Sequence, residues 1–200
     1  MNRRLGQWKK PNPLVELRQF KIQEREMSYL TTDQIGKLLE KLAEGNNRHT
    51  VMIAKVCLAT GARWSEAEKL ETRHIKGGQI EFAETKGRKV RYIPIEESFE
   101  RDLKNHHDEA ETGQRLFANA ASAFRSAIDR AGIRLPRGQL THILRHTFAS
   151  HFMINGGNIL VLQRSLDHES LKMTMRYAHL APDHLREVVK LNPLSALTVR

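Results

Sequence analysis

Residues 141–185 have the sequence THILRHTFASHFMINGGNILVLQRSLDHESLKMTMRYAHLAPDHL. Apolar residues recur in it at the spacing of amphipathic helices. The pattern predicts three helices, over 141–154, 158–166 and 170–178. Thr141 is placed to cap the first of them. His142 and Arg145 lie three positions apart in that helix, so both side chains can face one cleft.

Helical patterns also occur upstream of this stretch. In SYLTTDQIGKLLEKLAEG, Thr31 or Thr32 can cap a helix that Gly45 ends. The next helical run, HTVMIAKVCLATG, is apolar nearly all round, which predicts a central position in the core. Gly61 ends that run, and a short helix is predicted in RWSEAEKL.

The hydrophobic period changes between residues 74 and 95. QIEFA and KVRYIPI alternate like strands between turn glycines, which predicts a small antiparallel sheet with its tip at Lys86–Gly87. Further helices are predicted over 96–110, 119–131 and 183–191. The fold class is therefore mainly α with one small antiparallel β-sheet (α+β).

The chain is strongly basic. Its 200 residues carry a formal net charge of +10, which favours a polyanion such as nucleic acid as the partner. No run approaches ~18 uninterrupted apolar residues, so no membrane span is predicted, and the N-terminus lacks the apolar core of a secretory signal. The single cysteine, Cys57, lies in an apolar helical pattern, which fits a small core residue in a reducing compartment.

Four runs carry a resemblance to a known family. They are ATGARWSEAEKL, ETKGRKVRYIPI, LTHILRHTFASHF and LDHESLKMTMRYAHL. Together they resemble the tyrosine recombinases, the phage-integrase family of site-specific DNA recombinases. The long run at 141–185 looks most like integrases of temperate bacteriophages, and the resemblance covers about residues 25–190.

This resemblance implies a phosphoryl-transfer site in which Tyr177 is the nucleophile. The implied catalytic residues are Arg63, Lys86, His142, Arg145, His168 and Tyr177. Lys86 is the expected general acid for the departing 5′ oxygen, and only the match to the family pattern selects it from its cationic neighbours Arg88, Lys89 and Arg91.

The other members of the site have expected roles around the phosphate. Arg63 and Arg145 are expected to clamp it, and His168 to donate a hydrogen bond to a nonbridging oxygen. His142 is the expected hydrogen-bond partner or proton acceptor at the phosphate and the tyrosine. Glu66, three residues after Arg63, is expected to orient the site.

Two further histidines are expected to stay outside the chemistry. His146 and His151 follow Arg145 on the same helix, and we expect them to pack or cap locally. The pair His106 and His107 lies in a polar stretch, so we expect both side chains to be solvated; with no cysteine near them they make no convincing zinc site.

The implied reaction needs neither metal, ATP nor another cofactor. Attack by Tyr177 gives a 3′-phosphotyrosyl DNA and a free 5′ hydroxyl, and a hydroxyl of the same or a partner strand then reverses the attack. A free phenol has a pKa near ~10. We expect the nearby cations Arg63 and Arg145 to favour the phenolate and to stabilise the transition state.

One position departs from the family pattern. The family commonly has Leu-Gly-His where this chain has Leu166, Asp167 and His168. Aspartate is among the few residues that tolerate a positive φ, so we expect the backbone to be kept. We also expect the Asp167 carboxylate to raise the basicity of His168 and to reduce activity.

The resemblance also implies a division of the chain and a set of partners. Residues 1–28 are expected to be a linker from a missing N-terminal core-binding domain, 29–181 the catalytic domain, and 182–200 a C-terminal helix and tail that either docks on a neighbouring subunit or folds back. The expected partner is double-stranded DNA, bound by a homo-tetramer on two duplexes, with a monomer or dimer when DNA is absent. The resemblance leaves open whether accessory DNA-bending proteins take part. The expected location is the nucleoid in the bacterial cytoplasm.

Two alternatives remain at this point. The chain could be a catalytically impaired DNA-binding remnant, for which Asp167 is the only support. It could also be a relaxing enzyme like the type IB topoisomerases, which share the chemistry. The sequence does not determine which DNA site is recognised.

Overall fold

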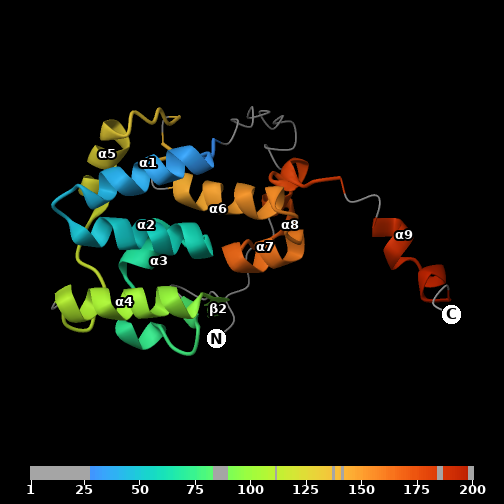
Figure 1. Ribbon diagram of the computed structural model, residues 1–200, viewed down its shortest axis with the longest axis horizontal. Helices are drawn as coiled ribbons and strands as arrows, with labels where there is room; N and C mark the ends of the chain where they lie inside the picture. Colours follow the sequence, from blue (N-terminus) through green and yellow to red (C-terminus); the bar gives the residue numbers. More distant parts are fainter. Residues whose placement is uncertain are drawn as a thin grey trace, which may run out of the picture.

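The computed structural model describes residues 28–82, 90–110, 112–136, 138–140, 142–183 and 187–197. The described part is mainly helical with one antiparallel pair of strands, as predicted (Figure 1). The α-helices are α1 (Thr32–Ala43), α2 (Arg48–Thr60), α3 (Trp64–Glu68), α4 (Glu97–Ala110), α5 (Ala121–Arg130), α6 (Ile143–Ile154), α7 (Ile159–Leu166), α8 (Leu171–Met175) and α9 (Glu187–Leu191). The strands are β1 (Gln79–Phe82) and β2 (Arg91–Pro94), and the 3₁₀ turns are η1 (Thr72–His74), η2 (Ala178–Leu180) and η3 (Pro193–Leu197).

The first two helices begin and end where the sequence predicts. Thr31 caps α1 through a capping box in which its hydroxyl accepts a hydrogen bond from the backbone N–H of Gln34. Asn47 caps α2, and Gly61 ends it in the left-handed conformation, with φ 70°. In Figure 1, α2 lies at the centre, with α1 and α6 packed against it, which confirms its predicted core position.

The two strands pair in a register that puts apolar side chains on one face. Ile80 lies opposite Ile93, and Phe82 lies opposite Arg91. Ile80 and Phe82 are buried while Glu81 between them is partly exposed, as expected for a half-buried ribbon. The predicted hairpin tip at Lys86–Gly87 lies outside the described residues.

The helix predicted over 170–178 is shorter in the structure. α8 ends at Met175, and Tyr177 immediately precedes the 3₁₀ turn η2. The backbone N–H of Tyr177 donates to Thr174 O at 3.0 Å, and Leu180 N–H donates to Tyr177 O at 3.1 Å. These bonds span three residues rather than four, so the chain tightens at the tyrosine.

Helices α6 and α9 begin next to residues that lie outside the described ranges. α6 begins at Ile143, after His142, and the expected cap Thr141 lies outside the described residues. α9 covers the second half of the helix predicted over 183–191, and residues 184–186 are not described.

Two clusters of buried apolar residues form the core, and α6 contributes to both. The larger cluster unites α1, α2, α5 and the sheet and includes Ile143 and Leu144 of α6. The smaller cluster consists of Ala149, Met153, Leu162, Leu166 and Tyr177. Cys57 lies fully buried in the larger cluster, as predicted. The expectation that His106 is solvated is wrong, because its ring is buried beside Phe117 and its Nε2 lies 2.9 Å from His49 Nδ1. Within the described residues, no helix is long and apolar enough to cross a membrane.

Candidate active site

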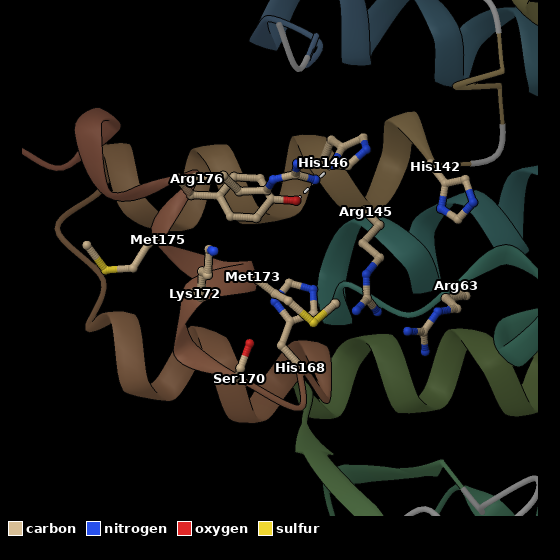
Figure 2. Close-up of a pocket in the computed structure, with 11 residues that line it drawn as sticks. Arg63, His142, Arg145, His146, His168, Ser170, Lys172, Met173, Met175 and Arg176 are labelled. Atoms are coloured by element: carbon tan, nitrogen blue, oxygen red, sulfur yellow. Dashed lines mark hydrogen bonds between the residues drawn. The ribbon is translucent and has the colours of Figure 1, made fainter. Parts of the chain in front are cut away.

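Five of the six predicted site residues line one cleft of about 820 Å³ (Figure 2). They are Arg63, His142, Arg145, His168 and Tyr177. They come from the α2–α3 corner, from α6, from the turn after α7 and from the turn between α8 and η2. The sixth, Lys86, lies outside the described residues.

Arg63 stands at the corner between α2 and α3. Gly61 turns the chain in the left-handed conformation, and Arg63 then precedes the first residue of α3 with extended backbone angles. Its guanidinium donates to Glu66 Oε1 at 2.8 Å, and its backbone N–H donates to Glu66 Oε2 at 2.8 Å. The side chain and the backbone of Arg63 are therefore fixed by the same carboxylate.

Glu66 also binds Arg91 of β2. Arg91 Nη2 donates to Glu66 Oε2 at 2.7 Å, and the Arg91 guanidinium lies 4.7 Å from the centre of the Phe82 ring. Burial by itself would raise the pKa of Glu66, but the hydrogen bonds and charges of Arg91 and Arg63 outweigh it and lower this pKa to about 2. The carboxylate is thus ionised at neutral pH and joins the sheet to the cleft.

Arg145 is a buried cation, with only 5% of its surface exposed. Its Nη1 donates to Gly61 O at 2.9 Å, and its Nη2 donates to Leu166 O. Burial, followed by the charge of Arg63, lowers the pKa of Arg145 to about 10, so the side chain stays charged at neutral pH. Its hydrogen bonds in the described part of the chain go to carbonyl oxygens, which leaves the positive charge to attract an anion in the cleft.

The turn that carries His168 uses the predicted positive φ. Among the described residues other than glycine, Asp167 alone has a positive φ, at 51°. The ring atom His168 Nδ1 lies 2.9 Å from Thr174 Oγ1, and its backbone N–H donates to Gln163 O at 3.1 Å. Since Thr174 engages Nδ1, an incoming ligand would meet Nε2 of His168.

The expectation that Asp167 raises the basicity of His168 is wrong. Burial, followed by the charges of Arg145, Arg63 and Arg176, lowers the pKa of His168 to about 4. The neighbouring carboxylate does not offset these effects, because the imidazole loses water and faces several cations at once.

Tyr177 is buried, with 2% of its surface exposed, and belongs to the smaller core cluster. Its hydroxyl lies 2.8 Å from His146 Nδ1, the contact drawn as a dashed line in Figure 2. Burial raises the pKa of Tyr177 above its ordinary value, although Arg145 and Arg176 act in the opposite direction. Arg145 therefore favours the phenolate as expected, but the loss of hydration outweighs its charge, so the net effect is a raised pKa.

His146 does not lie where the sequence pattern predicts. It was expected to pack or cap locally, but it lines the cleft and contacts the tyrosine hydroxyl. His142, the expected partner of that hydroxyl, is exposed, and its ring centre lies 6.3 Å from that of His146. The four-residue spacing of the two histidines on one helix face is a signal that could have found His146. His151 does act locally, since its Nε2 lies 2.8 Å from Leu30 O.

The described lining of the cleft carries positive charge and no acidic residue. Its cations are Arg63, Arg145, Lys172 and Arg176, beside the imidazoles of His142, His146 and His168. Such a set of fixed donors and cations suits a phosphate group. The arrangement can hold the charge that develops on phosphorus while the tyrosine hydroxyl approaches it.

Comparisons with known proteins agree on one family. The profile of the phage integrase family matches residues 28–184. The integrase of Escherichia phage 186 is 53% identical over 195 residues, which cover 98% of this chain and 56% of that protein. The catalytic domain of bacteriophage HP1 integrase has a similar structure, with a TM-score of 0.79 and 48% identity, over 85% of this chain and 98% of that chain.

A more distant structure shares the fold. The Tn1549 transposon integrase in complex with transposon right end DNA has a TM-score of 0.68 at 21% identity, over 84% of this chain and 67% of that chain. The chain spans about half the length of the curated phage integrases that it matches, 56% in the case of phage 186.

Proposed function

The chain belongs to the phage integrase family and has the fold of a tyrosine recombinase catalytic domain; from this premise we propose that it is the catalytic part of a site-specific DNA recombinase. Tyr177 attacks the scissile phosphate of double-stranded DNA and forms a 3′-phosphotyrosyl bond. A 5′ hydroxyl leaves, and the same or another strand's hydroxyl later displaces the tyrosine. The 3′-phosphotyrosyl bond keeps the energy of the broken phosphodiester bond, so the strands can be exchanged and resealed.

One observation carries this proposal. Side chains from four separate segments converge on a single cationic cleft that also contains a tyrosine hydroxyl. Arg63 and Arg145 would hold the nonbridging oxygens, and His168 would donate to one of them from Nε2. The charge gained by the pentacoordinate phosphorus would then be met by donors that are already in place.

The remaining roles rest on the family resemblance. Lys86 would protonate the leaving 5′ oxygen, because an ammonium can give up a proton where a guanidinium practically cannot. His142, exposed at the edge of the cleft, would serve the phosphate. Glu66 would keep Arg63 in its clamping position.

The partner is double-stranded DNA. The net charge of +10 supports a polyanion, and a relative of the same fold was solved in complex with transposon right end DNA. A homo-tetramer on two duplexes would bring the exchanging strands together. Exposed apolar residues near the C-terminus, Val188, Val189, Leu191 and Leu194, support docking of α9 on a neighbouring subunit.

The test is covalent attachment to DNA. A pool of nicked duplexes with randomised sequence is incubated with the chain, and DNA that stays attached in detergent is recovered and sequenced. We expect the chain to form such adducts, and Tyr177→Phe to form none while still binding the selected DNA. Tyr29→Phe is the matched control, because Tyr29 lies outside the cleft lining, and it should react like the unchanged chain.

Other outcomes identify the alternatives. Adduct formation by Tyr177→Phe would show that the nucleophile is wrong. DNA binding without any adduct would favour a remnant that has lost catalysis. Relaxation of supercoiled DNA without recombination between two sites would favour an enzyme like the type IB topoisomerases.

A further inference from the structure

We propose that His146 is a further catalytic residue, which accepts the phenolic proton of Tyr177 when the phenolic oxygen attacks phosphorus. This inference rests on the proposed function of the cleft. The observation behind it is the distance of 2.8 Å between His146 Nδ1 and the Tyr177 hydroxyl. A proton acceptor must lie within hydrogen-bond reach of the proton that it takes, and His146 already does so.

The direction of this hydrogen bond follows from the burial of the phenol. Tyr177 is 2% exposed, and among the described residues its hydroxyl has this single hydrogen bond. A buried hydroxyl proton needs an acceptor. A neutral imidazole offers one lone pair and one N–H. If Nδ1 carried the hydrogen, the phenolic proton would have no acceptor in the described part of the chain, so the hydroxyl donates and Nδ1 accepts.

The surroundings of His146 keep it in the basic form. Burial, followed by the charges of His142, Arg176 and Arg145, lowers the pKa of His146 to about 4. The imidazole is therefore neutral at neutral pH and free to take a proton. A phosphate held by Arg63 and Arg145 brings negative charge that offsets these cations, so the basicity of His146 rises when the substrate binds.

The proton and the electron pairs balance without another reactant. The phenolic O–H bond breaks and its proton moves to Nδ1. The phenolic oxygen forms a bond to phosphorus, the bond from phosphorus to the 5′ oxygen breaks, and that oxygen takes its proton from the general acid of the proposed function, Lys86. In the reverse step His146 returns the proton to the departing phenolate. His142, exposed and 6.3 Å away between ring centres, then serves the phosphate rather than the tyrosine.

The first test needs no DNA. The nitrogen NMR spectrum of the chain with ¹⁵N-labelled histidine distinguishes a ring nitrogen that carries hydrogen from one that does not, and His146→Asn identifies the signals of His146. We expect Nδ1 of His146 to carry no hydrogen and its signal to shift in Tyr177→Phe. A hydrogen on Nδ1 in the unchanged chain, or no shift in Tyr177→Phe, would overturn the proposal.

The second test measures adduct formation in a single turnover at saturating protein, on DNA selected as described above. Asn can hydrogen-bond from the position of Nδ1 but cannot accept a proton, so His146→Asn should slow the reaction by about 10²-fold or more. His151→Asn is the matched control on the same helix, because His151 contacts Leu30 O outside the cleft. It should react like the unchanged chain.

The pH dependence separates proton transfer from a structural role. Without an acceptor, hydroxide must remove the phenolic proton, so the rate of His146→Asn should rise steeply between about pH 6 and pH 9, and more steeply than that of the unchanged chain. The charged and titratable groups that face His146 are Tyr177 itself, His142 and Arg145 at the start of α6, His168 after α7 and Arg176 after α8. The unchanged chain and His146→Asn both contain all of these groups, so their titration affects the two rates alike and cancels in the ratio of the rates.

The outcomes are distinguishable. Equal rates, or rates of His146→Asn that are lower by the same factor at every pH, would overturn the role of His146 alone. Absence of any adduct from the unchanged chain would overturn the proposed function and this role together.

Discussion

Glu66 shows how one carboxylate organises the edge of the cleft. It binds the Arg63 guanidinium at 2.8 Å and the Arg91 guanidinium at 2.7 Å. Two like charges can approach each other there because an anion lies between them. Its side chain is 25% exposed, so water screens the pair less than at an open surface. Removal of the negative charge should therefore affect both folding and the position of Arg63.

The first residue-scale prediction concerns stability and pH. The pKa of Glu66 is about 2 in the folded chain, below its ordinary value of ~4.3. The resulting stabilisation is present above pH ~4 and is lost as the pH falls toward 2. We expect Glu66→Gln to lower the free energy of unfolding by about 2–3 kcal/mol at pH 7, and the difference to shrink toward pH 2.

Urea denaturation of both proteins at several pH values measures this difference. Glu40→Gln is the control, because the Glu40 side chain is exposed and its ion pair with Lys41 Nζ is long, at 3.5 Å. It should show no comparable loss. A difference between Glu66→Gln and the unchanged chain that stays constant from pH 7 to pH 2 would contradict the electrostatic explanation.

Tyr177 and His146 carry the chemical predictions at the same scale. Loss of the phenolic hydroxyl should abolish the covalent adduct, whereas loss of the imidazole should slow its formation and steepen its pH dependence. The two effects differ because the first change removes the nucleophile and the second removes only the base that activates it.

At the scale of elements, the corner between α2 and α3 depends on a glycine. Gly61 has φ 70°, and its carbonyl accepts a hydrogen bond from Arg145 at 2.9 Å. A Cβ added at Gly61 would lie 2.5 Å from Phe148 Cδ1 and 2.8 Å from Leu166 Cδ2. The hydrogen bond from Arg145 to the Gly61 carbonyl therefore depends on the close packing of this corner against Phe148 of α6 and Leu166 of α7.

We predict that Gly61→Ala lowers the free energy of unfolding by about 2–4 kcal/mol, because backbone strain and overpacking add. Gly132→Ala is the matched control, since Gly132 has φ 66° and an added Cβ meets nothing within 4 Å. Its free energy of unfolding should fall only by the cost of backbone strain, about 1 kcal/mol. Denaturation of both variants in urea isolates the packing contribution, and equal losses would show that the close contact is relieved without cost.

At the scale of the whole molecule, the active site lies across two cores. Arg63 follows the end of α2 and precedes α3, both in the larger cluster, whereas Tyr177 belongs to the smaller one. α6 joins the two clusters and carries Arg145 and His146 between them. Because the smaller cluster buries fewer apolar side chains, we expect the segment with the nucleophile to open without unfolding of the rest.

Hydrogen exchange tests this arrangement. We expect the amides of α7 and α8 to exchange at a free energy about 1–2 kcal/mol or more below that of α2. Leu162→Ala, in the smaller cluster, should weaken protection in α7 and α8 only. Ile53→Ala, in the larger cluster, should weaken protection throughout by about 2–5 kcal/mol. Uniform loss in both variants would show that the two clusters unfold as one.

The elements were predictable where local physics decides them. Helical periodicity, the capping box at Thr31 and the left-handed end at Gly61 all act within a few residues. The positive φ of Asp167 was likewise predicted from the residue type and its place in the family pattern. The set of site residues came from the family resemblance, and the structure brings together those that it describes.

The interactions among these residues follow from the folded arrangement of distant segments. The contact between His146 and Tyr177 joins positions 31 residues apart, and the second arginine on Glu66 comes from 25 residues away. The raised pKa of Tyr177 and the lowered pKa of His168 also depend on burial. The sequence by itself determined the helices, the strand pair and the chemical kinds of the site residues, because short-range sterics and periodicity govern those. Partners and protonation states depend on desolvation and on charges that the fold assembles from distant segments, and local sequence carries no record of them.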